Sequence, residues 1–258
     1  MFSKATLAKT LLVLLVFIFS TAPLHGEQLL YGVINYPPYI IIEDKYIIGI
    51  DVELMNAIAT RLNTEIRFFQ APWKRLLKMM EYGEIDILST VSRTAEREKY
   101  MQFVLPPYMQ GKKVFYILKG SGIKIDHYAD LYGLTIGTER GFEHFAPFDN
   151  DLKIRKQYSK SAVNLFQMLA SGRIDAFVGT EVVMDYLISK EAFKGKFEKA
   201  SYTRKGTPGY LSISGRSPYA RQLPRFNKIM MDLKSTGAIE ALFENFLKGE
   251  NIKRFEIK

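Results

Sequence analysis

Residues 76–87 read LLKMMEYGEIDI, and residues 165–176 read LFQMLASGRIDA. Each stretch has apolar side chains at helical spacing, then a glycine, and then an Ile-Asp pair that opens an apolar run. Because helices often end at a glycine in the left-handed conformation, each stretch predicts a helix followed directly by a buried strand. Such junctions also occur in unrelated sequences, but the repetition favours two similar α/β lobes over one continuous sheet.

The residues around the first copy alternate in the same way between strand and helix patterns. A helix is predicted over residues 73–82, ending at Gly83, and Asp51 is expected to cap another helix that extends to Leu62. Strands are predicted at residues 29–34, 66–69, 85–88, 113–118, 134–137 and 210–213, and amphipathic helices between residues 226 and 246. This order is typical of sheets with helices packed on them.

The composition is that of an ordinary folded protein, with 258 residues, 47% of them hydrophobic and 24% charged. The formal net charge is +9, but the basic residues are scattered among acidic ones, so the charge alone identifies no partner. The absence of cysteine excludes disulfides, thiolate metal sites and a cysteine nucleophile. With few histidines and no phosphate-binding or nucleic-acid-binding motif, we expect no metal, no cofactor and no nucleic-acid partner.

Residues 1–26 differ in character from the rest of the chain. Lysines precede an uncharged apolar run at residues 11–19, and small residues follow it. This pattern predicts a secretory signal peptide that is cleaved between Ala22 and Gly26. The alternative, a membrane anchor, needs about 20 apolar residues, roughly twice the length of this run. Because no cysteine is available for lipid attachment, we expect a periplasmic protein that is not a lipoprotein.

Several short motifs occur in a fixed order along the chain, and none of them is specific alone. They are YPPY (residues 36–39), GIDVELMNAIATRL (49–62), APW (71–73), GEIDIL (83–88), TAER (94–97), PPY (106–108), GLTIG (133–137) and SGRIDAFVGTEVV (171–183). Taken in order, they resemble the periplasmic solute-binding proteins of family 3, the amino-acid-binding type, which share their fold with glutamate-receptor ligand domains. The resemblance covers nearly all of the chain after residue 26.

This resemblance implies an α/β fold of two lobes, the type II periplasmic-binding-protein clamshell, in which two hinge crossover strands join the lobes and the ligand lies between them. In the family layout, lobe one would comprise residues 27–110 and 207–258, and lobe two would comprise residues 111–206. The hinge would lie near residues 110–111 and again at residues 206–209. The glycines in these segments suit a hinge, since a hinge must absorb backbone rotation.

Arg97 closes the T-x-x-R motif, and the resemblance implies that it forms a two-pronged pair with a carboxylate of the ligand. A guanidinium group suits this role because it is planar, permanently charged and presents a fork of donors. The alternative is a surface arginine paired with Glu96 or Glu98. The resemblance also places Ser92 and Thr90 in the site, although hydroxyl residues are common in turns.

Tyr36 and Trp73 match positions at which the family places a side chain over the apolar part of the ligand. Large rings offer contact area and can stack on a cation or on another π system. The alternative for Trp73, the only tryptophan, is a core ring at the start of a helix.

The second lobe departs from the family pattern. Thr180 occupies the position at which amino-acid-binding members carry an acid that pairs with the α-ammonium group of the ligand. A hydroxyl is neutral, which leaves room for a plain organic acid. Residues 138–144 read TERGFEH, with Phe142 and Glu143 where small hydroxyl residues are usual. We expect Phe142 in the site, and Arg140 and Glu143 either in the site or in solvent.

Arg75 and Arg93 are close in sequence to the expected site residues. If both face inward with Arg97, the site would prefer an anion with more than one carboxylate. The alternative is that they belong to a solvated surface that also carries Lys74 and Lys78.

These features predict a monomeric binding protein, without catalytic residues, that captures an amino acid or related small carboxylate and delivers it to an inner-membrane ABC permease. Closure requires only that the ligand binds the closed form more tightly than the open form. One alternative is an enzyme that resembles the periplasmic cyclohexadienyl dehydratases, with Glu143 or Glu181 as general acid. Another is a sensory partner that presents its ligand to a membrane receptor.

Overall fold

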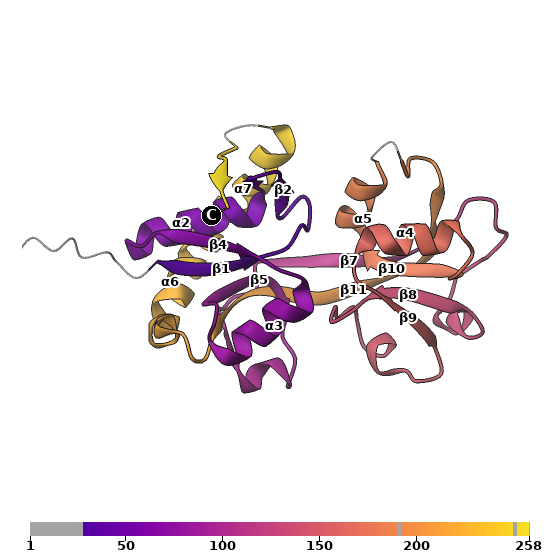
Figure 1. Ribbon diagram of the computed structural model, residues 1–258, viewed down its shortest axis with the longest axis horizontal. Helices are drawn as coiled ribbons and strands as arrows, with labels where there is room; N and C mark the ends of the chain where they lie inside the picture. Colours follow the sequence, from indigo (N-terminus) through magenta and orange to yellow (C-terminus); the bar gives the residue numbers. More distant parts are fainter. Residues whose placement is uncertain (1–27, 190–191, 250–251, 258) are drawn as a thin grey trace, which may run out of the picture.

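The computed structural model describes residues 28–189, 192–249 and 252–257. Figure 1 shows two lobes joined by two long strands that run from one lobe into the other. These crossover strands are β7 (Met109–Leu118) and β11 (Phe197–Ser214). The predicted two-lobed α/β fold is therefore confirmed. The predicted signal peptide at residues 1–26 lies outside the described residues.

The first lobe is built from elements before β7 and after β11 (Figure 1). Those before β7 are β1 (Leu29–Val33), β2 (Ile41–Glu43), β3 (Tyr46–Ile48), α2 (Ile50–Leu62), β4 (Ile66–Gln70), α3 (Trp73–Tyr82), β5 (Ile87–Ser92), the 3₁₀ helix η2 (Arg97–Lys99) and β6 (Met101–Phe103). Those after β11 are the 3₁₀ helix η5 (Pro218–Gln222), α6 (Leu223–Ser235), α7 (Ala238–Lys248) and β12 (Phe255–Glu256).

The second lobe lies between the crossover strands in the sequence. Its elements are η3 (Tyr128–Leu131), β8 (Thr135–Glu139), η4 (Phe148–Asn150), β9 (Arg155–Ser159), α4 (Ala162–Ala170), β10 (Ala176–Thr180) and α5 (Glu181–Ile188). Its core packs the rings of Tyr116, Phe166 and Phe177 between α4 and the strands β7 and β10. No helix in the described part of either lobe is long and apolar enough to cross a membrane.

The main sheet passes through both lobes in the order β4-β1-β5-β11-β7-β10-β8-β9, and β6 also pairs with β11. Pairing is parallel within each lobe, where β1 lies between β4 and β5, and β8 lies between β9 and β10. It is antiparallel wherever a crossover strand takes part, since β11 pairs with β5, β6 and β7, and β7 pairs with β10. The two lobes therefore share one hydrogen-bonded ladder, because each crossover strand is long enough to belong to both.

The junction that the repeated sequence predicts is present in both lobes. Helix α3 ends at Gly83, whose φ of 77° is left-handed, and β5 follows. In the second lobe α4 ends at Ser171, and Gly172, with φ of 69°, comes one residue later. The aspartates of the two Ile-Asp pairs then make the same contact. Leu30 N donates to Asp86 Oδ2 at 2.7 Å, and Thr135 N donates to Asp175 Oδ2 at 2.7 Å.

One local prediction was wrong, and another was correct but too short. Asp51 does not cap α2, because Gly49 precedes the helix and Asp51 is fully buried in its first turn. Tyr108 Oη donates to Asp51 Oδ2 at 2.8 Å, and burial raises the pKa of Asp51 to about 7. The strand predicted at residues 210–213 is only the end of β11, which spans 18 residues. Its other half is polar and exposed, so hydrophobic periodicity did not detect it.

The lobe boundaries expected at residues 110–111 and 206–207 stay a prediction. Both positions lie inside the crossover strands, and the pairing of β11 with β7 shifts in register between Lys205 and Pro208. We propose that the lobes divide there, because an interruption in the ladder is a place where backbone rotation costs few hydrogen bonds.

Candidate ligand-binding site

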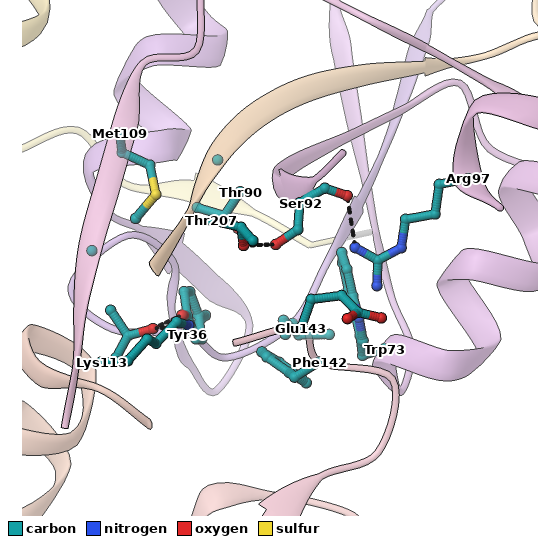
Figure 2. Close-up of a pocket in the computed structure, with 14 residues that line it drawn as sticks. Tyr36, Trp73, Thr90, Ser92, Arg97, Met109, Lys113, Phe142, Glu143 and Thr207 are labelled. Atoms are coloured by element: carbon teal, nitrogen blue, oxygen red, sulfur yellow. Dashed lines mark hydrogen bonds between the residues drawn. The ribbon is translucent and has the colours of Figure 1, made fainter. Parts of the chain in front are cut away.

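A pocket of about 520 Å³, including space open to solvent, lies between the two lobes. It contains every site residue expected from the sequence, namely Tyr36, Trp73, Thr90, Ser92, Arg97, Phe142 and Thr180. The sequence analysis did not identify the remaining lining residues Ile34, Met109, Gly111, Lys113, Thr207 and Gly209, and it left Glu143 open. Figure 2 shows most of these side chains gathered around one space. The structure thus brings together residues that are far apart in the sequence.

Arg97 is the first residue of η2, and only 5% of its surface is exposed. Its Nη1 atom donates to Ser92 O at 2.9 Å in the first lobe, and its Nη2 atom donates to Gly141 O at 2.8 Å in the second. Burial lowers the pKa of Arg97, and the nearby Glu143 acts in the opposite direction. The alternative of a surface arginine is wrong, because Arg97 is buried and Glu98 pairs with Arg93 instead. Arg97 is a buried cation held in a fixed orientation at the pocket wall.

Thr90 and Ser92 lie at the end of β5, where the strand bulges. At this point β5 has one residue more than the paired stretch of β11. Thr90 adopts a left-handed φ of 54°. Thr90 N donates to Tyr108 Oη at 2.9 Å, and Ser92 Oγ lies 2.8 Å from Thr207 Oγ1. A β-branched residue rarely takes this conformation, so the bulge strains the backbone where it lines the pocket.

The aromatic wall of the pocket comes from both lobes. Phe142 of the second lobe lies between two rings of the first, 5.9 Å from Tyr36 and 5.8 Å from Trp73 between ring centroids. Trp73 Nε1 donates to Gly141 O at 3.0 Å. The indole is only partly buried, and it packs at the edge of the core of its own lobe. It contacts the facing lobe, and the rings provide a flat apolar surface for a ligand.

Thr180 ends β10 and lies next to a lysine that the sequence analysis missed. Lys113 Nζ donates to Thr180 Oγ1 at 2.9 Å, and Tyr36 Oη lies 2.9 Å from the same hydroxyl oxygen. Lys113 is 7% exposed, and burial lowers its pKa to about 8. Its pairing with Thr180 across β7 and β10 is a matter of strand register, for which the sequence carries no short-range signal.

Comparisons with known proteins identify the family of the chain. The sequence profile of the bacterial extracellular solute-binding proteins, family 3, matches residues 30–249. The chain belongs to this family. The ABC transporter arginine-binding protein 1 of Escherichia coli (strain K12) is 27% identical over 226 residues, which cover 86% of this chain and 91% of that protein.

Two solved structures share the fold of this family 3 protein. A mutant of ArgBP from T. maritima superposes with a TM-score of 0.74 at 23% identity, covering 86% of this chain and 95% of that one. A histidine kinase sensor domain with similarity to periplasmic binding proteins superposes with a TM-score of 0.74 at 22% identity, covering 86% and 96%. At these identities the likeness establishes the fold alone.

Several charged residues considered from the sequence lie outside the pocket of this solute-binding protein. Arg75, Arg93 and Arg140 are exposed and do not line it. Glu181 forms ion pairs with Lys199 at 2.8 Å and with Lys112 at 3.5 Å. The hydrogen bond from Lys199 lowers the pKa of Glu181, the opposite of what a general acid requires. The described chain has no group of three or more histidine, aspartate and glutamate residues that could hold a metal ion.

The crossover glycines of this solute-binding protein have a steric role. Neither Gly111 nor Gly206 has a positive φ. A Cβ atom at Gly111 would lie 2.6 Å from Thr180 Cγ2, and one at Gly206 would lie 2.8 Å from Gly111 O. Glycine suits these positions because neighbouring strands approach closely there, in addition to any freedom that it gives a hinge.

Proposed function

We propose that this solute-binding protein captures a small carboxylate-bearing solute, an amino acid or a related organic acid, and delivers it to an inner-membrane ABC permease. The observation that carries the proposal is Arg97, a buried guanidinium that lines the pocket between the lobes. Two of its donors are paired with backbone carbonyl groups, which carry no net charge. No ion pair in the described chain includes Arg97, although Glu143 lies near enough to favour its charged form. The guanidinium is thus oriented, and a carboxylate is the ligand group that best satisfies it.

The contacts across the pocket suggest how a ligand would favour closure. Arg97 Nη2 and Trp73 Nε1 of the first lobe both donate to Gly141 O of the second. Tyr36 of the first lobe shares a hydrogen bond with Thr180 of the second. These contacts form only while the lobes are together. A ligand that touches both walls would add its own contacts to the closed form, and so shift the population towards it.

The proposal includes the location and the assembly of the protein. The segment at residues 1–26 would direct the chain to the periplasm and be removed, and no cysteine is available to carry a lipid. The protein would act as a monomer that meets the permease after ligand has closed the lobes. The Escherichia coli relative, named as an ABC transporter arginine-binding protein, supports the part of the proposal that concerns the permease.

The test is a binding measurement on protein expressed from its full-length gene, unfolded and refolded to remove bound solutes. Thermal-shift screening against amino acids and organic acids identifies ligands, because binding raises the melting temperature by mass action. Calorimetry then compares the wild type with Arg97→Met and with Arg93→Met. Arg93 is a matched control because it is exposed, belongs to the same segment and is paired with Glu98.

We expect Arg97→Met to weaken carboxylate binding about a hundredfold, or roughly 3 kcal/mol, and Arg93→Met to change it little. Circular dichroism must show that both variants are folded. The proposal fails if no carboxylate raises the melting temperature of the wild type, or if Arg97→Met binds the selected carboxylate as tightly as the wild type does.

A further inference from the structure

A buried ammonium group lies across the pocket from Arg97. Lys113 lines the pocket and is 7% exposed, and Figure 2 shows it beside Tyr36, with Arg97 on the other side. No ion pair among the described residues includes Lys113, although the adjacent Lys112 pairs with Glu181 at 3.5 Å. A charge that is buried without an ion-pair partner is costly. Its retention in a pocket therefore points to a partner that comes from outside the chain.

The hydrogen-bond donors around Lys113 outnumber the acceptors. An ammonium group has three N–H donors, and Lys113 donates one of them to Thr180 Oγ1. The hydroxyls of Thr180 and Tyr36 share one hydrogen bond, which uses one of their two hydrogens whichever group is the donor. Two N–H groups and one O–H group are thus left without an acceptor among the described residues. Unused hydrogen-bond donors on and beside a cation suit an anionic oxygen acceptor such as a carboxylate.

Close packing fixes the position of this ammonium group. A Cβ atom at Gly206 would lie 2.8 Å from Lys113 Cε, and a Cβ atom at Gly111 would lie 2.6 Å from Thr180 Cγ2. The glycines let the stem of Lys113 and the side chain of Thr180 pack directly on the crossover strands. Lys113 is therefore held by its surroundings, as binding groups are, and does not sample the many conformations of a surface lysine.

Two acids act on Lys113 without occupying its free donors. Asp149 in η4 and Glu139 at the end of β8 both favour its charged form. Neither accepts a hydrogen bond from it in the described structure, where the hydrogen bond of Lys113 Nζ goes to Thr180. Burial raises the pKa of Asp149 to about 6 and that of Glu139 to about 7. These acids help to keep Lys113 protonated while its ammonium group faces the pocket.

We propose that the pocket binds a small diacid, with one carboxylate on Arg97 and the second on Lys113, Thr180 and Tyr36. The inference rests on the proposed function, since Arg97 must hold the first carboxylate. An α-ammonium group beside Thr180 would meet the like charge of Lys113, so an aliphatic diacid without an α-amino group is the preferred class. Because Arg97 and Lys113 belong to different sides of the pocket, one diacid would bridge them and favour closure.

The experiment compares acids that differ by one carboxylate. Calorimetry on the ligand-stripped protein measures malonate, succinate, glutarate and adipate, each against the monoacid with the same number of carbons, with L-glutamate and L-arginine as amino-acid probes. The variants are Lys113→Met, Lys113→Gln and the matched control Lys112→Met. Lys112 is adjacent and its side chain is 52% exposed.

At least one diacid should bind roughly tenfold or more tightly than its monoacid. Lys113→Met should reduce the affinity for that diacid roughly thirtyfold and change the affinity for the monoacid less than about threefold. Lys113→Gln keeps donors but no charge and should lie between, while Lys112→Met should match the wild type. If Lys113→Met does not fold, the comparison of diacid with monoacid in the wild type and in Lys113→Gln decides.

The inference is overturned if diacids bind no better than monoacids, or if both Lys113 variants weaken the binding of diacids and monoacids equally. It is also overturned if L-arginine binds more tightly than every diacid. In the last case Glu143, which also lines the pocket, would be the residue to test for the ligand cation. In each of these cases carboxylates still bind and Arg97→Met still weakens them, so the proposed function stands. Binding of no acid at all would overturn both.

Discussion

The two lobes are alike at one end of their central strands and different at the other. Where β5 and β10 begin, each lobe has an Ile-Asp pair whose aspartate accepts a hydrogen bond from the backbone of a neighbouring strand. Each also has a glycine, Gly32 or Gly137, that leaves room for apolar side chains. Where the strands end, the first lobe bulges at Thr90 and the second stops at Thr180. The repeated part builds the fold, and the divergent part forms the pocket.

The cations that these ends bring to the pocket also differ in chemistry. Arg97 is held between backbone carbonyl groups of both lobes. Lys113 lies on a crossover strand and donates a hydrogen bond to a single hydroxyl. A guanidinium presents a rigid fork of donors, whereas an ammonium is a compact point charge. If the proposed diacid binds, Arg97 would orient one carboxylate through this fork, while Lys113 would mainly supply a positive charge for the other.

The largest effect should come from the aspartates that define the shared junction. Asp86 accepts from Leu30 N at 2.7 Å and also from Ser217 Oγ at 2.6 Å, whereas Asp175 accepts from Thr135 N at 2.7 Å. With about 2 kcal/mol for each hydrogen bond to a charged group, Asp86→Ala should cost about 4 kcal/mol and Asp175→Ala about 2 kcal/mol. Urea denaturation measures both losses of stability. Equal losses would mean that the hydrogen bond from Ser217 to Asp86 does not stabilise the fold.

The next effect is the change in stability with pH that is expected from Lys113. Burial lowers the pKa of Lys113 to about 8 from its ordinary value of 10.5. Between these values the unfolded chain binds more protons than the folded chain, so the free energy of unfolding should rise with pH. Relative to Lys113→Met, the wild type should gain up to about 3 kcal/mol across this window. Parallel profiles for the two proteins, from urea denaturation at several pH values, would count against a desolvated Lys113.

The smallest effect tests whether the shared glycines are equivalent. A Cβ atom at Gly32 would lie 2.6 Å from Ile85 Cδ1, and one at Gly137 would lie 2.5 Å from Ile174 Cδ1. Because overpacking a core costs about 1–3 kcal/mol, Gly32→Ala and Gly137→Ala should destabilise the protein by similar amounts, about 2 kcal/mol each. Hydrogen exchange shows which lobe loses protection in each variant. A loss confined to one variant would mean that only one lobe depends on this close contact.

The sequence predicted most of the fold because its signals are local. Helix α3 was expected at residues 73–82, where it lies, since its apolar spacing and Gly83 mark both the helix and its end. The β2-β3 hairpin and β9 were not expected, because they are short or polar. The site residues expected by family resemblance line one pocket, but their role in binding stays a prediction.

By itself, the sequence determined the helices and strands with strong periodicity, the duplicated junction and the motif that ends at Arg97. Only the tertiary structure decided that Lys113 faces Thr180, that Arg93 and Arg75 face solvent, and that Phe142 reaches the rings of the facing lobe. The physical reason is range. Periodicity and turn chemistry act over a few neighbouring residues, whereas Lys113 and Thr180 are 67 residues apart and meet only through the register of β7 with β10.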